Sequence, residues 1–297
     1  MDGISIKTAC LEKWKDSSEL DERLTRFDEN FESWLKQIPT ENQALVLTLV
    51  QHLEYYSHKA TNKWLAELHK QLIEQASISD ENTIFAFIKS EYGKSNSSND
   101  YWTEYKAINR INTNICIENL DVLDSDDWSF IENIVFIDDF SGTGESFIKE
   151  LRKDIARFKN KSIYFITIDI MYSAINAIEQ FASENELKIF VLSSFKQEKA
   201  FERDLFDDNE TSKAELVSIS KKFKIPEREI LGFEKSQALV AFYNNTPNNT
   251  LGIIRYDTKS YTSLFPRKND HVPHWMQLKK RKQGRTRANY NNAKQGK

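Results

Sequence analysis

The chain has few cysteines and no long apolar segment. Its 297 residues include only Cys10 and Cys116, too few for a disulfide framework and not spaced like metal ligands. No stretch approaches the roughly 20 apolar residues that a membrane-spanning helix needs, and the first 15 residues lack the apolar core of a signal peptide. We therefore expect a soluble, cytoplasmic protein with no membrane partner and no resident metal site.

Charge is distributed unevenly along the chain. The formal net charge is −4, but residues 267–297 carry ten Lys or Arg against one acid, Asp270, a net +9 that leaves −13 on residues 1–266. This segment is also poor in apolar residues, so we expect a flexible basic tail. Such a tail suits RNA, DNA or a nucleoprotein through phosphate neutralisation. A solvated tail that only aids solubility explains the same composition equally well.

Residues 1–78 are predicted to form an N-terminal helical region. Apolar residues at alternating spacings of four and three draw one stripe along a helix over 17–36, behind a start signal at Ser17 and Ser18. This stripe comprises Leu20, Leu24, Phe27, Phe31 and Trp34. Further apolar residues predict two more helices, which begin near Thr40 and end near Ala76.

Residues 79–266 are predicted to form an α/β domain, a parallel sheet flanked by helices. Short apolar runs at 83–89, 134–138, 162–170 and 187–192 are typical of buried strands, and 145–158 and 173–185 have the apolar spacing of helices. Alternation of this kind favours a parallel sheet with both faces covered. The following segment, to about Lys222, is polar, and its acidic cluster is interpreted as a solvated helix and loop. That cluster is Asp204, Asp207, Asp208 and Glu210.

The stretch IVFIDDFSGTGES (134–146) runs from a strand into two acids and a loop of small and hydroxyl residues. A Walker A loop needs lysine where Glu145 stands, a dinucleotide fingerprint needs glycine where Phe147 stands, and an EF-hand needs an oxygen ligand where Phe140 stands. These three interpretations are excluded.

What remains fits a site for a sugar phosphate. Asp138 and Asp139 would lie at the carboxyl end of a strand, where open α/β sheets bind ligands, and could accept hydrogen bonds from sugar hydroxyls. Glycines in the loop allow close approach of the backbone to a phosphate, and the N–H groups at the start of the next helix attract it. Hydroxyl donors come from Ser141, Thr143 and Ser146.

The pattern D-D-x-x-x-T-G-x-[ST] resembles the phosphoribosyl pyrophosphate (PRPP) motif of type I phosphoribosyltransferases. The resemblance implies that Asp138 and Asp139 hold the ribose 2′ and 3′ hydroxyls in catalysis and that Mg²⁺ is carried by the pyrophosphate of the substrate. It also implies that the loop wraps the 5′-phosphate. The loop residues are Ser141, Gly142, Thr143, Gly144, Glu145 and Ser146.

Beyond this motif, most of the chain resembles the phosphoribosyltransferase-like family of prokaryotic conflict systems, PRTase-CE. The resemblance rests on the N-terminal helices, the motif, TPNNT (246–250) and LFPR (264–267). It implies a component of an antiviral defence system, including retron-type systems, with partner proteins from that system. Three hypotheses stay open: an enzyme that acts on PRPP or a nucleotide, a non-catalytic nucleotide sensor, and an assembly subunit that binds nucleic acid through its tail.

Other candidate residues carry weaker signals. In salvage enzymes a second loop binds pyrophosphate, and GKSNSSND (93–100) corresponds to it, with Lys94 offering charge and Ser95 a donor; an ordinary surface loop is an equal alternative. TPNNT could be a polar rim of the pocket or a turn whose side chains bond their own backbone. His271 and His274 are more typical of structural or exposed histidines, so no general base is identified.

Overall fold

The computed structural model describes residues 2–15, 21–89 and 97–267. These described residues form one compact unit. Several residues named in the sequence analysis lie outside the described residues: Ser17, Ser18, Leu20, Lys94, Ser95, His271 and His274. Among the described helices, none is long and apolar enough to cross a bilayer.

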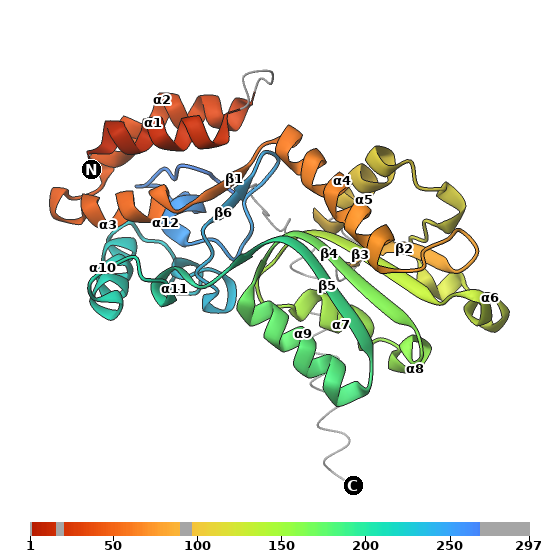
Figure 1. The fold of residues 1–297 in the computed structure, drawn as a ribbon. Helices are drawn as coiled ribbons and strands as arrows, with labels where there is room; N and C mark the ends of the chain where they lie inside the picture. Colours follow the sequence, from red (N-terminus) through yellow and green to blue (C-terminus); the bar gives the residue numbers. More distant parts are fainter. Residues whose placement is uncertain (1, 16–20, 90–96, 268–297) are drawn as a thin grey trace, which may run out of the picture. The chain divides into compact units, whose positions relative to one another are not determined.

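The described N-terminal residues form helices and one short strand, whose arrangement Figure 1 shows. They are α1 (Gly3–Trp14), α2 (Glu22–Gln37), α3 (Thr40–Gln51), β1 (Glu54–Tyr56) and α4 (His58–Gln75). The predicted stripe on α2 is buried from Leu24 to Trp34, and the helix is capped by Asp21, whose carboxylate accepts from the backbone N–H groups of Arg23 and Leu24. Helix α1 and strand β1 were not predicted.

A parallel four-stranded sheet forms the centre of the chain, as the alternation of strands and helices predicted. Its strands, in spatial order, are β2 (Thr83–Phe87), β3 (Asn133–Ser141), β4 (Ser162–Met171) and β5 (Lys188–Gln197). Helices α4 and α5 (Ser97–Asn109) lie on one face, and α7 (Glu145–Leu151) and α9 (Tyr172–Asn185) lie on the other (Figure 1). Every residue of β3 is buried, so its motif begins in the sheet interior.

Two short helices differ from the predicted pattern. The helix expected over 145–158 is interrupted, because Asp154 caps a separate turn, α8 (Ile155–Phe158). A short helix, α6 (Ser125–Phe130), precedes β3.

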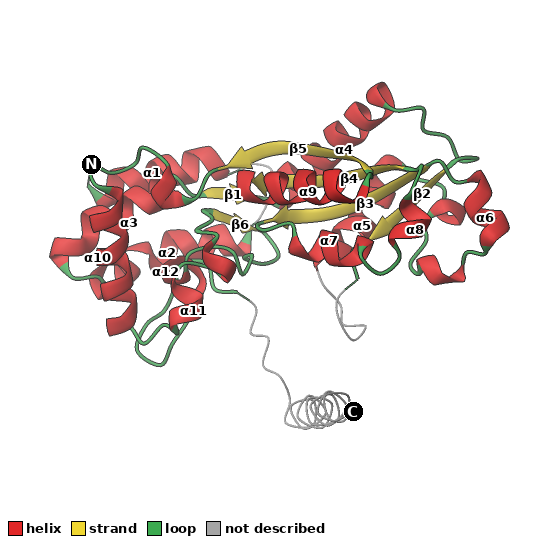
Figure 2. Cartoon of the chain, turned by 90° about the horizontal axis from the view of Figure 1, so that it is seen from below, coloured by secondary structure: helices red, strands yellow, loops and turns green. Residues whose placement is uncertain are grey.

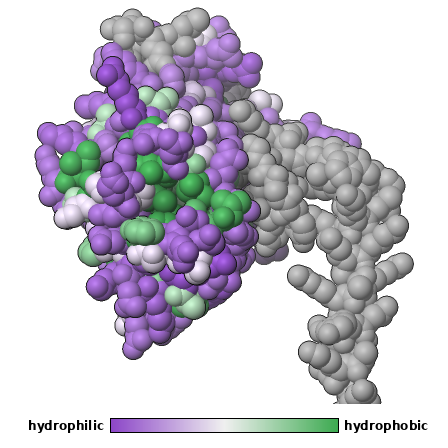
Figure 3. Space-filling view, turned by 90° about the vertical axis from the view of Figure 1, so that its right-hand side faces the viewer, coloured by the Kyte–Doolittle hydropathy of each residue, from purple (hydrophilic) through white to green (hydrophobic). Residues whose placement is uncertain are grey.

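The side of the molecule that carries α6 is largely hydrophilic, with one group of apolar residues (Figure 3). Val122 and Phe130, close to and within α6, are among the most exposed large apolar side chains.

The C-terminal described residues return to the N-terminal helices. This part contains α10 (Asn209–Lys222), α11 (Glu227–Ile230), β6 (Val240–Phe242) and α12 (Gly252–Arg255), and β6 pairs in parallel with β1. Phe265 of LFPR stacks on Phe27 of α2 with ring centroids 5.4 Å apart, and the Trp34 indole donates to the Tyr261 hydroxyl at 2.6 Å. These contacts therefore join chain segments more than 200 residues apart into an apolar core separate from the one around the four-stranded sheet.

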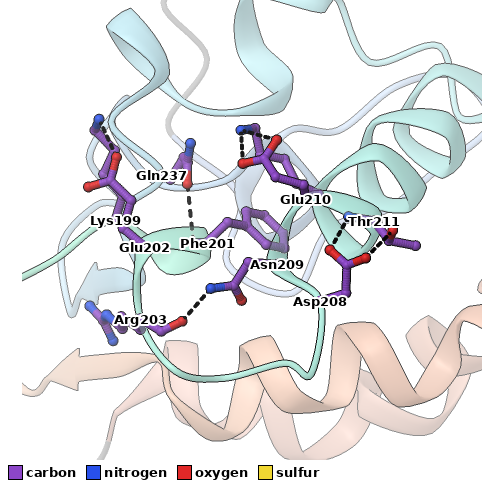
Figure 4. Close-up of polar contacts among 10 residues, drawn as sticks. Lys199, Phe201, Glu202, Arg203, Asp208, Asn209, Glu210, Thr211 and Gln237 are labelled. Carbon is purple, nitrogen blue, oxygen red and sulfur yellow. Dashed lines mark hydrogen bonds and ion pairs between the residues drawn. The ribbon is translucent and has the colours of Figure 1, made fainter.

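The acidic cluster after β5 serves the local structure. Asp208 caps α10 by accepting from the backbone N–H and hydroxyl of Thr211 at 3.0 and 2.6 Å, and Glu210 pairs with Lys213 at 3.0 Å (Figure 4). Asp204 and Asp207 are exposed. The interpretation of this cluster as a solvated helix and loop therefore agrees with its contacts.

Candidate ligand-binding site

Two adjacent carboxylates lie at the carboxyl end of β3. Asp138 and Asp139 are only 9 % and 7 % exposed, and the Asp139 N–H donates to Asp138 Oδ1 at 3.0 Å. Burial raises the pKa of Asp138 well above its usual range; the Asp139 carboxylate raises it further, and the Ser97 hydroxyl lowers it. A ligand that donates hydrogen bonds or brings a cation would relieve this destabilised charge.

The loop after these acids is held from several sides. Gly144 takes a left-handed conformation (φ 73°) as the N-cap residue of α7 and supplies no side-chain cap, which leaves the N–H groups that follow Glu145 in the first turn of α7 for a ligand. Thr143 Oγ1 accepts from the Glu145 N–H at 3.4 Å. The Gly142 carbonyl accepts from Ser173 of α9 at 3.2 Å.

The side-chain amide of Asn249 lies directly against Gly142. A Cβ atom at Gly142 would overlap the terminal atoms of that amide. Asn249 is buried, and it cannot easily swing away because its Nδ2 donates to Ser236 Oγ at 3.1 Å while Ser236 Oγ donates to the Asn249 carbonyl at 3.0 Å. The TPNNT segment thus meets the loop where the loop carries no side chain.

A cavity of about 740 Å³ lies between this loop and the TPNNT segment, within the size range of small-molecule sites. All six loop residues from Ser141 to Ser146 line it, together with both aspartates. The remaining lining residues come from β3, from the end of β2, from the start of α5, from α7 and the turn after it, and from the C-terminal segments. These are Ile88, Lys89, Ser97, Ser98, Phe140, Phe147, Lys149, Glu150, Lys153, Phe233, Asn245, Thr246, Pro247, Asn248, Asn249 and Arg267.

Arg23 of α2 fastens the segments that close the cavity. Its guanidinium donates to the Phe242 carbonyl at 2.7 Å, to Thr246 Oγ1 at 2.7 Å and to the Pro266 carbonyl at 3.1 Å. Arg267 adds a bond from Nη1 to the Thr246 carbonyl at 2.7 Å. TPNNT and LFPR are therefore neighbours in space, joined through an N-terminal helix.

Lys94 and Ser95 are not described, but residues on both sides of their segment are. Ser98 donates to the Ile137 carbonyl at 2.6 Å and accepts from the Ile88 N–H at 2.9 Å, so α5 begins beside the end of β2 and the middle of β3. The assignment of Lys94 and Ser95 to pyrophosphate stays a prediction.

Several cavity residues were missed by the sequence analysis. Lys89 is the last residue of the predicted strand at 83–89, so its place at a carboxyl strand end could have been inferred. Glu150 is buried, accepts from the Lys89 N–H at 3.2 Å and pairs with Lys153 at 2.6 Å. Phe233 gave no local signal, because only tertiary packing brings it to the cavity. The same holds for Arg23, which does not line the cavity but bonds to Thr246, which does.

A second buried carboxyl lies one strand away, at the carboxyl end of β4. Asp169 Oδ2 accepts from the Tyr56 hydroxyl at 2.9 Å and from the Gln197 amide. Burial raises the pKa of Asp169 to about 7, although both hydrogen bonds act to lower it. Asp169 does not line the cavity described above, so we assign it no part in ligand binding there.

Metal ligands are sparse in the described part of the chain. No three His, Cys, Asp or Glu side chains come together there as ligands for an ion. Because Mg²⁺ prefers a full shell of oxygen ligands, a magnesium ion beside Asp138 and Asp139 would depend on oxygens that the bound molecule provides.

Comparison with known proteins places the chain in a family. Comparison with curated proteins gave no match. Among solved structures, the Helicobacter pylori xanthine-guanine-hypoxanthine phosphoribosyltransferase matches with a TM-score of 0.31 and 14 % identity, over 50 % of this chain and 92 % of that one. The PRTase-CE family profile matches residues 31–267, which include β3, the aspartate pair, TPNNT and LFPR. The chain belongs to the PRTase-CE family.

Proposed function

We propose that this protein binds PRPP or a related nucleotide in the cavity at the carboxyl end of β3. The observation that carries the proposal is that Asp138 and Asp139 line the same cavity as the whole 141–146 loop. In this arrangement the two carboxylates accept hydrogen bonds from the ribose 2′ and 3′ hydroxyls, and the loop hydroxyls and N–H groups hold the 5′-phosphate.

A phosphoribosyl transfer at this site would use mainly positioning and electrostatics. Displacement at the sugar C1 develops positive charge on the ring, which two neighbouring carboxylates stabilise. A magnesium ion that enters with the substrate would neutralise charge on the pyrophosphate leaving group. Asp138 and Asp139, which line the cavity, could help to hold this ion. A sensor would use the same contacts without breaking the bond, so pyrophosphate release separates the two cases.

Replacing both aspartates should weaken binding strongly. In calorimetric titration of PRPP with magnesium, we expect Asp138→Asn/Asp139→Asn to bind about a hundredfold or more weakly, since each charge-assisted hydrogen bond contributes about 1.5–3 kcal/mol. The control, Asp204→Asn/Asp207→Asn, removes the same charge from exposed positions and should bind like wild type. Equal affinity of all three folded proteins would contradict the proposed site, and so would the absence of binding to wild type.

The basic tail supplies a second candidate function, the binding of nucleic acid by residues 267–297. Its net charge of +9 on an otherwise acidic chain is what favours it. Truncation after Met276 should weaken binding of labelled single-stranded DNA, measured by fluorescence anisotropy, and flatten its salt dependence, because fewer counterions are released. A salt slope equal to that of the full chain would show that the tail does not bind.

The defence setting and its partner proteins are proposed from the family resemblance alone. If the ligand site serves such a system, protection of cells against phage should be lost in Asp138→Asn/Asp139→Asn and kept in Asp204→Asn/Asp207→Asn. Equal protection by both variants would separate the site from the defence role.

A further inference from the structure

A buried carboxylate on α7 ties two lysines to one end of the cavity. Glu150 is only 7 % exposed, and its Oε2 accepts from the Lys153 ammonium at 2.6 Å and from the Lys89 N–H at 3.2 Å. All three residues line the cavity, and we call this part of it the lysine end. Helix α7 lies on the same face of the sheet as α9 (Figure 2). Glu150 therefore connects this helix to the chain that follows β2.

Both lysines keep hydrogen-bond donors for a ligand. Among the described residues, the Lys153 ammonium bonds to Glu150 and the Lys89 ammonium bonds to Asn119 Oδ1. Each ammonium carries three N–H donors, so these contacts leave two donors on each. The Lys153 side chain is 57 % exposed, so its ammonium reaches a ligand in the cavity without breaking a buried contact.

The lysine end lies beside the aspartate pair and away from the 141–146 loop. Ser98 accepts from the Ile88 N–H at 2.9 Å, and the neighbouring Ser97 hydroxyl is close enough to Asp138 to lower its pKa. Glu150 lies five residues along α7 from Glu145, a rise of about 7–8 Å. The aspartates therefore lie between the loop at the start of α7 and the lysines near its end.

The lysine end is also the more positive of the two ends of α7. At the start of the helix, Glu145 pairs with Lys149 at 2.7 Å, one acid for one base. At the lysine end, Lys89 and Lys153 share a single cavity-lining acid, Glu150, among the described residues. Lysine ammonium groups bind phosphate oxygens through charge-assisted hydrogen bonds. This end therefore suits the more highly charged of two phosphate groups on one ligand.

We propose that Lys153 and Lys89 bind the pyrophosphate group of the ligand, an inference that rests on the function proposed above. In PRPP the pyrophosphate is attached at C1, on the same face of the ring as the 2′ and 3′ hydroxyls. With the 5′-phosphate in the loop and these hydroxyls on Asp138 and Asp139, the pyrophosphate is directed toward the lysine end. Lys153 is then a binding residue outside the segment 93–100, to which the sequence analysis assigned the pyrophosphate.

Two ligands that differ in the pyrophosphate test this assignment. In calorimetric titrations with magnesium, we expect Lys153→Met to weaken PRPP binding about tenfold or more, because a charge-assisted hydrogen bond is lost. Binding of ribose 5-phosphate should change by no more than about twofold. The control, Lys159→Met, removes an exposed lysine that pairs with Glu186 and does not line the cavity, so it should bind both ligands like wild type.

The outcomes separate this inference from the proposed function. If wild type binds PRPP and Lys153→Met weakens both ligands equally, or neither, the lysine assignment is overturned and the proposed function stands. If folded wild type does not bind PRPP, both are overturned.

Inorganic pyrophosphate gives a second test that does not depend on the aspartates. With magnesium, it should bind wild type and Asp138→Asn/Asp139→Asn with similar affinity, and it should bind Lys89→Met/Lys153→Met about tenfold or more weakly. Thermal unfolding checks that each variant is folded. Equal affinity of wild type and the double lysine variant would overturn the assignment, and so would the absence of binding to wild type.

Discussion

Replacement of Gly142 with alanine is expected to destabilise the protein and to weaken ligand binding about tenfold or more. The new methyl group would occupy the position of the Asn249 amide, which is buried and bonded to Ser236. Either the amide or the loop backbone must move, and overpacking of this kind costs about 1–3 kcal/mol. Thermal unfolding reports the stability, and titration of PRPP with magnesium reports the binding.

A second variant separates the steric effect from a lost ligand contact. Asn249→Ala removes the obstructing amide. In the Asn249→Ala protein, adding Gly142→Ala should therefore cost much less stability than Gly142→Ala costs in the wild type. Non-additivity of this size is expected only for side chains in contact. If the two changes are additive, Gly142 and Asn249 are not coupled, and the close approach of TPNNT to the loop is wrong.

Replacement of Arg23 with methionine is expected to lower stability by about 3 kcal/mol, because three hydrogen bonds from one charged group are lost together. For a chain of this size, that corresponds to a decrease in Tm of roughly 6–12 °C. Methionine keeps much of the apolar side chain, so the measured loss reflects mainly the guanidinium. Ligand affinity should fall as well, since Thr246 lines the cavity.

Arg26 provides the matched control for Arg23. It lies one turn along the same helix but is exposed, so Arg26→Met should change the unfolding free energy by no more than about 0.5 kcal/mol. Arg23→Lys should lie between, because an ammonium cannot reproduce the fork that reaches Phe242, Thr246 and Pro266. Equal stability of the Arg23→Met and Arg26→Met proteins would contradict the role of Arg23 as a fastening residue.

The sheet could be predicted because its signals are local. Each buried strand of a parallel sheet is a continuous apolar run, and the four expected strands appear as β2 to β5, with β3 and β5 longer than expected. Helix α1 has no strong apolar stripe and buries only Ile6, Cys10 and Trp14, so its pattern gave little to detect. Strand β1 has three residues and forms only because β6 pairs with it.

The two sides of the candidate site differ in how far the sequence predicts them. Asp138, Asp139 and the glycines of the loop lie within one short stretch of sequence, so one strand end followed by one turn specifies their chemistry. The far side of the cavity is assembled from Phe233, TPNNT and Arg267, none of which adjoins β3 along the chain. The sequence analysis left two interpretations of TPNNT open because a polar rim and a self-bonded turn have the same composition.

The parallel α/β core could be predicted from the sequence, as could the aspartate pair, the loop and the basic composition of residues 267–297, because apolar period, turn residues and charge are properties of short segments. Three features came from tertiary packing: α2 fastens TPNNT and LFPR through Arg23, Asn249 rests on Gly142, and β5 pairs with β4 alone among the described strands. These features depend on contacts between residues as much as 243 positions apart. Such contacts follow from the packing of the whole chain and leave no periodic mark in any one part of it.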